Sequence, residues 1–366
     1  MASILRSTVH RSGFHRFTFH RSTFHRSTVH ASVLMSADAS VLPPGIAGVH
    51  RAAAPLPLRW GGELADWSVG WEVVGDPALP LVVVVGGISA GRHLTANSAD
   101  ATPGFWPGVV GAGRAIDTDR VAALGIDWLG GRGASTLPPD EVAIDTWDQA
   151  RAIAAVLDGI GVARVQALVG ASYGGMVALA FAALFPERLG RAVAIGAAHE
   201  SAPMTTGLRS IQRRIVRLGL ETGRERDALA LARALGVTTY RSAVEFNVRF
   251  AGPPQVERGV ARFPIESYLE HLGRRFSEAF PARGFLALSQ SCDLHQVDPA
   301  EIAAPVTLIG VEEDTLVPPG QVRTLAAALG DRATLVMLHS KYGHDAFLAD
   351  PAIADEVARA LATDAA

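Results

Sequence analysis

The feature that most constrains this chain is a serine placed at a sharp turn between two apolar segments. The sequence GASYGG (170–175) ends the apolar run VQALVG and opens a second apolar segment that continues to Phe185 and stops at Pro186. A Gly-x-Ser-x-Gly sequence between a strand and a helix predicts a turn so tight that the serine takes strained backbone geometry, which only small neighbours permit. This context predicts that Ser172 is a nucleophile whose hydroxyl forms an acyl-enzyme.

The same motif occurs a second time, at GISAG (87–91), directly after the apolar run LVVVVG. The segment that follows Ser89, RHLTANSAD, is polar and lacks the pattern of an amphipathic helix, so we do not expect Ser89 to be the nucleophile. In α/β folds with this turn, the loop after an earlier strand supplies one backbone N–H to the oxyanion hole, and the residue after the nucleophile supplies the other. We therefore expect the backbone N–H groups of Ile88 and Tyr173 to form the oxyanion hole.

Apolar runs alternate with segments of helical periodicity along most of the chain. Continuous runs of this kind are typical of strands buried in a parallel sheet, and their alternation with helices predicts a doubly wound, mostly parallel α/β sheet. The segment 58–76 is expected to form two antiparallel strands ahead of the first run. Buried strands are expected in LVVVVGG, VAALGIDWLG, VQALVG, AVAIGA, PVTLIGVE and ATLVMLH.

Strand patterns stop between about residues 199 and 300, where helical segments such as LRSIQRRIVRLGL and IESYLEHLGRRFSEAF follow one another. We therefore predict that residues 199–300 form a helical cap inserted into a core built from residues 35–198 and 301–366. A cap over the carboxyl ends of the strands would cover the edge at which such sheets place their sites.

A serine hydroxyl needs a base to attack a carbonyl carbon, and the base needs an acid that orients its ring. With this turn the partners follow in the chain order Ser, Asp, His. His344 lies on a loop after the last strand, where an imidazole can reach the turn, whereas His339 closes that strand, so we favour His344. The acid should end the preceding strand, where Asp314 fits better than its neighbours Glu312 and Glu313.

Six segments spread along the chain carry a family resemblance. They are GGISAGRH, GFWPGVVGAGRAIDTDR, GASYGGM, LARALGVTTYRS, FPIESYLEHLGRRF and GHDAFL. Together they make nearly the whole chain after residue 35 resemble the homoserine O-acyltransferases, the homoserine O-acetyltransferase and O-succinyltransferase family of the α/β-hydrolase superfamily. The combination of AIDTDR with GHDAFL and the cap segments is the most specific part. The resemblance implies the α/β-hydrolase fold with a helical cap.

The resemblance also implies roles for individual residues. Ser172, Asp314 and His344 correspond to the catalytic triad. Arg233 corresponds to the arginine that holds the carboxylate of the amino-acid substrate, and Asp345 to the acid that holds its ammonium group. Both assignments are physically sensible, because a guanidinium and a carboxylate are the natural complements of those two groups.

The implied reaction is a ping-pong transfer. Ser172 takes an acyl group from acetyl-CoA or succinyl-CoA, and the γ-hydroxyl of L-homoserine then attacks with His344 as the base, a step of methionine biosynthesis. Acyl-CoA is a co-substrate, and neither a cofactor nor a metal is expected. A serine O-acyltransferase of the same family and an α/β-hydrolase esterase stay open as alternatives, because a fold does not fix a function.

Three further arginines stay open as substrate ligands. Arg213 is the alternative to Arg233 for the acceptor carboxylate. A succinyl group would need a nearby cation, which Arg92 or Arg132 could supply.

Composition limits the classes of partner and the compartment that we expect. The formal net charge is −3 at pH 7, although residues 1–34 hold five arginines and no acid, so the remainder is distinctly acidic and a nucleic-acid partner is not expected. No apolar run reaches the roughly 18 residues of a membrane span. Cys292 is the only cysteine, which favours a cytoplasmic protein without disulfides. The family resemblance implies a homodimer formed through the cap.

Residues 1–34 include a repeated five-residue unit of the type RSTVH. A strict period of five gives a helix no continuous apolar face, so we expect this tail to be disordered. Three interpretations stay open: an upstream repeat translated ahead of a start at Met35, a tail without function, and a transit peptide or metal-binding tract.

Overall fold

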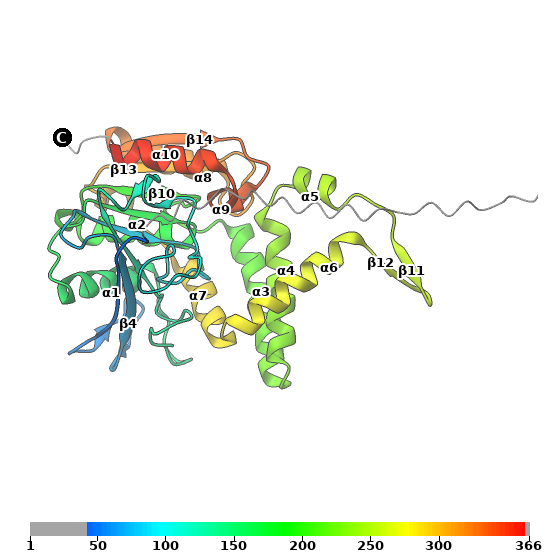
Figure 1. Cartoon of the computed structure of the whole chain (residues 1–366). Coiled ribbons are helices and arrows are strands. Elements are labelled where there is room, and N and C mark those ends of the chain that lie inside the picture. The colour runs from blue at the N-terminus through cyan, green and yellow to red at the C-terminus, as the bar shows by residue number, and fades with distance from the viewer. Residues whose placement is uncertain (1–41, 363–366) are drawn as a thin grey trace, which may run out of the picture. The chain divides into compact units, whose positions relative to one another are not determined.

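The computed structural model describes residues 42–362, and the predicted tail at 1–34 lies outside them. An eight-stranded sheet forms the centre, in the order β1-β4-β8-β5-β9-β10-β13-β14 (Figure 1). The β1–β4 and β4–β8 pairs are antiparallel and the other neighbours are parallel. This is the mostly parallel sheet that the sequence predicts. Its strands are β1 (Gly45–Arg51), β4 (Ser68–Val74), β5 (Leu81–Val85), β8 (Ala122–Ile126), β9 (Ala167–Ala171), β10 (Ala192–Ile195), β13 (Val306–Val311) and β14 (Ala333–Leu338).

Helices cover both faces of the sheet. Along β5, Val83 and Val85 belong to one apolar core, and Val82 and Val84 to the other, because successive side chains of a strand point to opposite faces. The first core includes α1, α2 and α8, and the second includes α9 and α10. The helices outside the cap are α1 (Thr146–Gly159), α2 (Tyr173–Leu184), α8 (Pro319–Leu329), α9 (Ala346–Ala349) and α10 (Pro351–Ala362), with 3-10 turns η1 (Pro186–Arg188), η2 (Pro299–Glu301), η3 (Gly330–Arg332) and η4 (Gly343–Asp345).

The first strands differ from the prediction. Residues 58–76 were expected to form two antiparallel strands paired with each other, but β4 pairs along its whole length with β1. Within that segment β3 (Glu63–Leu64) is only two residues long and pairs with β2 (Leu56–Pro57). A further short pair joins β6 (Val110–Gly111) to β7 (Ile116–Asp117).

Five helices between β10 and β13 lie within the predicted insertion at 199–300. The helix α3 packs against α4 and α7, and α4 packs against α6 (Figure 1). A short exposed hairpin, β11 (Gln255–Glu257) and β12 (Val260–Arg262), interrupts the helices, although no strand was expected there. The cap helices are α3 (Pro203–Glu221), α4 (Glu225–Tyr240), α5 (Ala243–Arg249), α6 (Pro264–Ala279) and α7 (Ala282–Leu294).

Hydrogen bonds tie the cap to the loops after β13 and β14. The Ser242 hydroxyl donates to the Lys341 carbonyl at 2.6 Å, and the Thr205 hydroxyl donates to the Leu316 carbonyl at 2.9 Å. The Thr315 hydroxyl of the core donates to a carbonyl at the end of α4 at 3.0 Å. The cap therefore rests directly on the two loops that carry Asp314 and His344. Between residues 42 and 362, no helix combines the length and the apolar character needed to cross a membrane.

Candidate active site

Ser172 lies at the turn between β9 and α2 with φ 56° and ψ −118°, a conformation that residues with a side chain rarely adopt. The space around the turn explains its glycines. A Cβ on Gly170 would collide with the carbonyl of Gly174, and a Cβ on Gly174 would collide with the carbonyl of Val85. The turn thus presses α2 closely against β5 and β9. It leaves the Ser172 side chain free of any helix-capping bond.

The Ser172 hydroxyl begins a hydrogen-bonded chain of three side chains. Its oxygen lies 2.7 Å from His344 Nε2, and His344 Nδ1 lies 2.7 Å from Asp314 Oδ2. The other carboxylate oxygen of Asp314 accepts the backbone N–H groups of Leu316 and Val317, which fixes its orientation. With the carboxylate ionised, Nδ1 carries the proton, so Nε2 can accept the proton of the serine. The structure therefore brings together the three side chains that the sequence grouped as a triad.

Burial and charge act in opposite directions on His344. Burial alone lowers the pKa of the imidazole, but the charge and hydrogen bond of the Asp314 carboxylate raise it above the ordinary value of 6.5. The ring is thus a stronger base than an isolated histidine, which favours proton transfer from a hydroxyl.

The alternative base and acids make contacts elsewhere. His339 Nδ1 lies 3.0 Å from a carboxylate oxygen of Glu313, and Glu312 pairs with Arg323. None of these side chains contacts Ser172 or His344 through a hydrogen bond.

The two predicted oxyanion donors are the backbone N–H groups of Ile88 and Tyr173. The Gly87 carbonyl accepts hydrogen bonds from the indole of Trp128 at 3.1 Å and from the backbone of Ala90 at 2.9 Å. Because the peptide is planar and trans, the N–H of Ile88 points the opposite way. The Ser172 carbonyl accepts a helical bond, so the N–H of Tyr173 points out of the helix N-terminus.

The two segments that carry these N–H groups lie side by side. A Cβ on Gly87 would lie 4.0 Å from the Ser172 Cβ, so the loop and the turn are close neighbours. Within residues 42–362 neither N–H has another hydrogen-bond acceptor. Both donors are therefore available to a substrate oxygen.

Trp128 contacts Tyr173 and also Gly87, the residue before Ile88. Besides its bond to the Gly87 carbonyl, its ring meets the Tyr173 ring edge-on, with 5.0 Å between centroids. Leu129, the residue after Trp128, is held by the side chain of Gln149 on α1. The Gln149 side chain accepts the Leu129 N–H at 3.1 Å and donates to the Leu129 carbonyl at 2.8 Å. Trp128, a buried side chain that sequence analysis did not single out, thus positions the loop of Gly87 and Ile88, called the oxyanion loop below.

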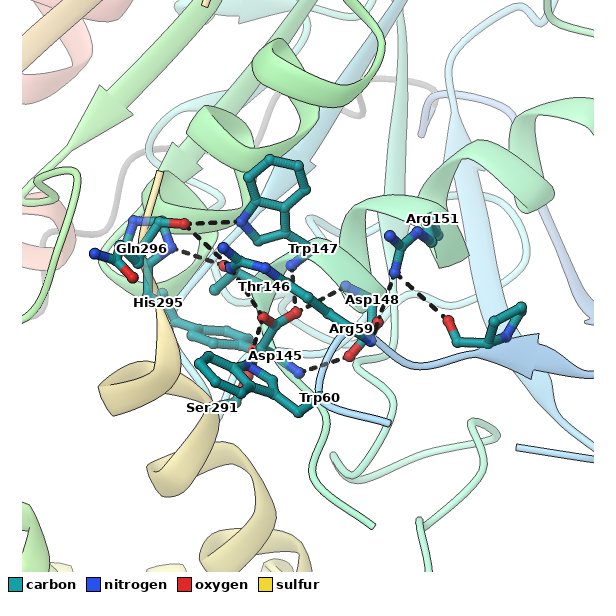
Figure 2. A network of polar contacts seen from close by, with 12 residues as sticks. Arg59, Trp60, Asp145, Thr146, Trp147, Asp148, Arg151, Ser291, His295 and Gln296 are labelled. Atoms are coloured by element: carbon teal, nitrogen blue, oxygen red, sulfur yellow. Dashed lines mark hydrogen bonds and ion pairs between the residues drawn. The ribbon is translucent and has the colours of Figure 1, made fainter. Parts of the chain in front are cut away.

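A polar network joins the N-terminus of α1 to the end of α7 (Figure 2). The Tyr173 hydroxyl is hydrogen-bonded to Ser291 on α7 at 2.6 Å. The Thr146 hydroxyl donates to His295 Nδ1 at 2.7 Å, and His295 Nε2 donates to the Ala198 carbonyl at 2.9 Å. Burial lowers the pKa of His295 to about 3, so this ring is neutral and its part is structural.

The Ser172 hydroxyl opens onto a pocket between core and cap. The core contributes the oxyanion loop and the loops that carry Asp314 and His344, and α3, α4 and α7 contribute the opposite wall. Polar side chains of the cap that line this pocket are Arg209, Gln212, Arg233, Thr239, Tyr240, Ser289 and Cys292.

Arg233 and Asp345, the two predicted substrate ligands, both line this pocket. Arg233 donates to the Tyr240 hydroxyl at 3.1 Å and lies over the rings of Tyr240 and Phe276, 4.8 Å from each centroid. In the part of the chain that the structure describes, no carboxylate lies within ion-pair distance of it. Asp345 accepts a hydrogen bond from Arg241 at 3.3 Å, and burial raises its pKa.

The three arginines left open by the sequence do not line this pocket. Arg213 is buried against α7, where it bonds to Ser289 and pairs with Asp293 at 2.5 Å. Arg92 pairs with Asp127 at 3.6 Å, and Arg132 lines a neighbouring cavity.

Comparison with known proteins places the chain in a family. A family model described as the alpha/beta hydrolase fold matches residues 80–351. A homoserine O-succinyltransferase from Xanthomonas campestris pv. campestris is 42% identical over 84% of this chain and 81% of its own length. The chain belongs to the homoserine O-acyltransferase family of α/β-hydrolases. A serine O-succinyltransferase from Frateuria aurantia is 34% identical over 82% of this chain and 94% of its own.

The fold of the chain also matches a solved structure. The crystal structure of a homoserine O-acetyltransferase from Bacillus anthracis superposes with a TM-score of 0.80, over 88% of this chain and 99% of the other. The two sequences are only 18% identical, so this likeness concerns the fold.

Sequence analysis of this family member missed one charged residue of the pocket, Arg209. Its spacing of four residues from Arg213 places both residues on the same face of α3, but the spacing does not indicate that this face meets the pocket. No group of three or more His, Cys, Asp or Glu side chains within residues 42–362 is arranged to hold a metal ion.

Proposed function

We propose that this family member transfers an acyl group from acyl-CoA to the hydroxyl of L-homoserine, a reaction that would belong to methionine biosynthesis. The observation that carries the proposal is the hydrogen-bonded chain Ser172–His344–Asp314 at a pocket that also presents Arg233 and Asp345. These three hydrogen-bonded side chains alone would serve hydrolysis equally well. Arg233 and Asp345 in addition complement the carboxylate and ammonium groups of an amino acid. The 42% identity to a homoserine O-succinyltransferase supports this acceptor.

In the first half-reaction Ser172 becomes acylated. His344 Nε2 accepts the hydroxyl proton while the oxygen attacks the thioester carbon, and the N–H groups of Ile88 and Tyr173 stabilise the oxyanion. The carbon–sulfur bond then breaks, and the sulfur takes the proton from His344. CoA leaves as the thiol, and the acyl-enzyme remains.

In the second half-reaction the acceptor takes the place of CoA. Arg233 binds its carboxylate and Asp345 its ammonium group, so the γ-hydroxyl lies beside His344. The hydroxyl gives its proton to His344 and attacks the ester carbon, and the Ser172 oxygen leaves with that proton. The cap shields the ester from water while the acceptor binds, which favours transfer over hydrolysis.

Thiol release from acyl-CoA tests the proposal. The purified protein is incubated with acetyl-CoA or succinyl-CoA, and with homoserine, serine or no acceptor. Release that depends on homoserine is the expected result. Release that depends on serine would support the alternative acceptor suggested by the Frateuria aurantia relative. Release without any amino acid would show an esterase and overturn the transferase proposal.

Two variants separate the half-reactions. Ser172→Ala should abolish the acyl-enzyme detected by mass spectrometry, and acylation retained in this variant would mean that another residue is the nucleophile. Arg233→Ala should still form the acyl-enzyme but raise KM for homoserine, because it removes only the contact with the acceptor carboxylate.

We also propose that the protein acts in the cytoplasm as a homodimer that pairs through the cap. Exposed apolar side chains are concentrated there, and burying such side chains favours association. Light scattering coupled to gel filtration tests the mass, and a monomer would overturn the dimer. The exposed side chains include Ile211, Leu218, Leu231, Val244, Val248 and Val256.

A further inference from the structure

Asp345, the proposed ligand of the acceptor's ammonium group, lies where a negative charge is costly. Its side chain is only 21% exposed, and burial raises the pKa of its carboxyl above the ordinary value of 3.8. A protonated carboxyl has no charge to offer to an ammonium group. The acceptor site therefore needs a positive charge beside Asp345 that keeps this carboxyl ionised before the acceptor binds.

Arg241 supplies such a charge from outside the pocket. Its Nε donates to Asp345 Oδ2 at 3.3 Å, and its charge lowers the pKa of the Asp345 carboxyl against the effect of burial. Asp345 lines the pocket at Ser172, whereas Arg241 does not. The second carboxylate oxygen, Asp345 Oδ1, accepts no hydrogen bond from the residues between 42 and 362. The protein thus holds one oxygen of this carboxylate and leaves the other for a ligand.

Two further charged side chains act on Asp345, but both have other tasks. After burial, the groups that affect the pKa of its carboxyl are His344, Arg241 and Arg233. His344 carries a positive charge only while it holds the proton taken from a hydroxyl, and Arg233 faces the acceptor carboxylate in the proposed site. Among these three, Arg241 alone is hydrogen-bonded to the Asp345 side chain. It is therefore the positive charge that stays with Asp345 throughout the reaction.

The Arg241 guanidinium is itself held in place by neighbouring groups. Its Nη1 donates to Glu245 Oε1 on α5 at 3.0 Å, and the Glu245 side chain is almost completely buried. The ring of Tyr342 lies 5.5 Å from the guanidinium carbon. The next residue, Ser242, donates its hydroxyl to the carbonyl of Lys341 at 2.6 Å, which fixes the backbone. Arg241 thus bridges a carboxylate of the cap and a carboxylate of the loop that carries the base, in an orientation set by its surroundings.

We infer that Arg241 is a positioning residue of the acceptor site, which orients the Asp345 carboxylate and keeps it charged so that the free oxygen can bind the ammonium group of the amino acid. The inference rests on the proposed function and adds a residue that does not touch the acceptor. Because Arg241 acts through Asp345, its loss should affect the second half-reaction and leave the first one intact.

Arg241→Met separates the two half-reactions. With saturating acyl-CoA, kcat/KM for homoserine should fall about tenfold or more, because the charged hydrogen-bond partner of Asp345 is lost. The value of kcat/KM for acyl-CoA should stay nearly constant, since acylation of Ser172 does not use the acceptor site. 4-Hydroxybutanoate, which is homoserine without its ammonium group, should lose much less than homoserine does. A cap that was merely loosened would lose activity with both acceptors.

The dependence on pH gives a second readout. In Arg241→Met the pKa of the Asp345 carboxyl should rise further, because the cation in contact with it is gone. The midpoint of kcat/KM for homoserine should therefore move to higher pH, while the midpoint for acyl-CoA, which follows His344, stays where it is. Arg241→Lys keeps the positive charge and should restore the midpoint. It should restore only part of the rate, because an ammonium group lacks the planar fork that contacts both carboxylates.

Arg249→Met is the matched control. Arg249 also pairs with Glu245, at 3.3 Å, but it does not contact Asp345, so its kinetic constants should equal those of the unmodified protein. An unchanged kcat/KM for homoserine in Arg241→Met, or equal losses with both acceptors, would overturn the inference while the acyltransferase proposal stands. If Arg241→Met does not fold, Arg241→Gln takes its place and is judged by the same outcomes. No homoserine-dependent thiol release by the unmodified protein would overturn the proposed function and this inference with it.

Discussion

Trp128 offers a way to separate the positioning of the oxyanion donors from the rest of the site. In Trp128→Phe an aromatic ring remains to pack against Tyr173, but the hydrogen bond to the Gly87 carbonyl is lost. The Gly87–Ile88 peptide is then less firmly oriented. We expect kcat to fall about tenfold, the factor that corresponds to one net hydrogen bond of roughly 1.4 kcal/mol, with little change in KM. Steady-state kinetics with acyl-CoA measure both constants.

Trp67→Phe provides the control for that change. Trp67 also donates its indole N–H to a backbone carbonyl, that of Ala54 at 3.0 Å, but it does not line the pocket. Its kcat should match that of the unmodified protein. An equal loss in both variants would mean that the effect comes from stability and not from the oxyanion loop.

The pH dependence of acylation follows from His344. The ring must be neutral to accept the Ser172 proton, and the neutral form predominates above the pKa. Because Asp314 raises this pKa above 6.5, activity should be lost as the pH falls through a midpoint that lies above 6.5. A profile of kcat/KM for acyl-CoA against pH gives that midpoint. A midpoint below 6.5 would contradict the dominance of Asp314 over burial.

At the scale of elements, the N-terminus of α1 is held by two neighbouring carboxylates (Figure 2). The Asp145 side chain accepts the backbone N–H groups of Trp147 and Asp148, and the Asp148 side chain accepts the N–H of Asp145 in return. Arg59 pairs with Asp145 and Arg151 pairs with Asp148. Burial, followed by the charge of Asp145, raises the pKa of Asp148 to about 6. The N-terminus of α1 is therefore sensitive to pH.

A raised pKa means that the folded protein holds the Asp148 proton more tightly than the unfolded chain does. The contribution of Asp148 to the free energy of unfolding is complete below pH 3.8 and is lost as the pH rises to about 6. The total loss is at most about 3 kcal/mol. Asp148→Asn is uncharged throughout. Urea unfolding at several pH values should show the variant gaining on the unmodified protein between about pH 4 and 6, with a constant difference above. A difference that does not change with pH would contradict the assignment.

The strands that could be predicted from sequence are those buried on both faces. β5 and β9 appear as unbroken apolar runs because helices cover each side of them. β1 is an edge strand with exposed and half-buried residues, so its sequence lacks both a continuous apolar run and a clear alternation. Its pairing with β4 depends on contacts that no local pattern contains.

The same distinction applies to the candidate site. Ser172 and its glycines form a local motif, and Asp314 and His344 follow strands in a fixed order, so the sequence could group them. The direction of the Arg209 side chain depends on how α3 packs against α7, and the contact of Trp128 with Gly87 joins two different loops. Such contacts are created by the packing of distant segments and were not predictable from spacing.

At the scale of the whole molecule, the cap and the triad depend on each other. Ser242 and Thr205 of the cap bond to the loops that carry His344 and Asp314, and Thr315 beside Asp314 bonds back to the cap. These contacts fix the wall that carries Arg209 and Arg233. A shift of the cap would therefore disturb both the acceptor site and the exclusion of water.

Ser242→Ala tests this dependence. The change removes the 2.6 Å bond to the Lys341 carbonyl and the N-cap bond to the backbone of Glu245, which should loosen α5 and the neighbouring end of α4 by about 1–3 kcal/mol. Water should then compete better for the acyl-enzyme, so the ratio of O-acyl product to released thiol should fall. Thr222→Ala is the control, because its hydroxyl bonds only within α3. A ratio that stays constant in Ser242→Ala would mean that the cap excludes water without this anchor.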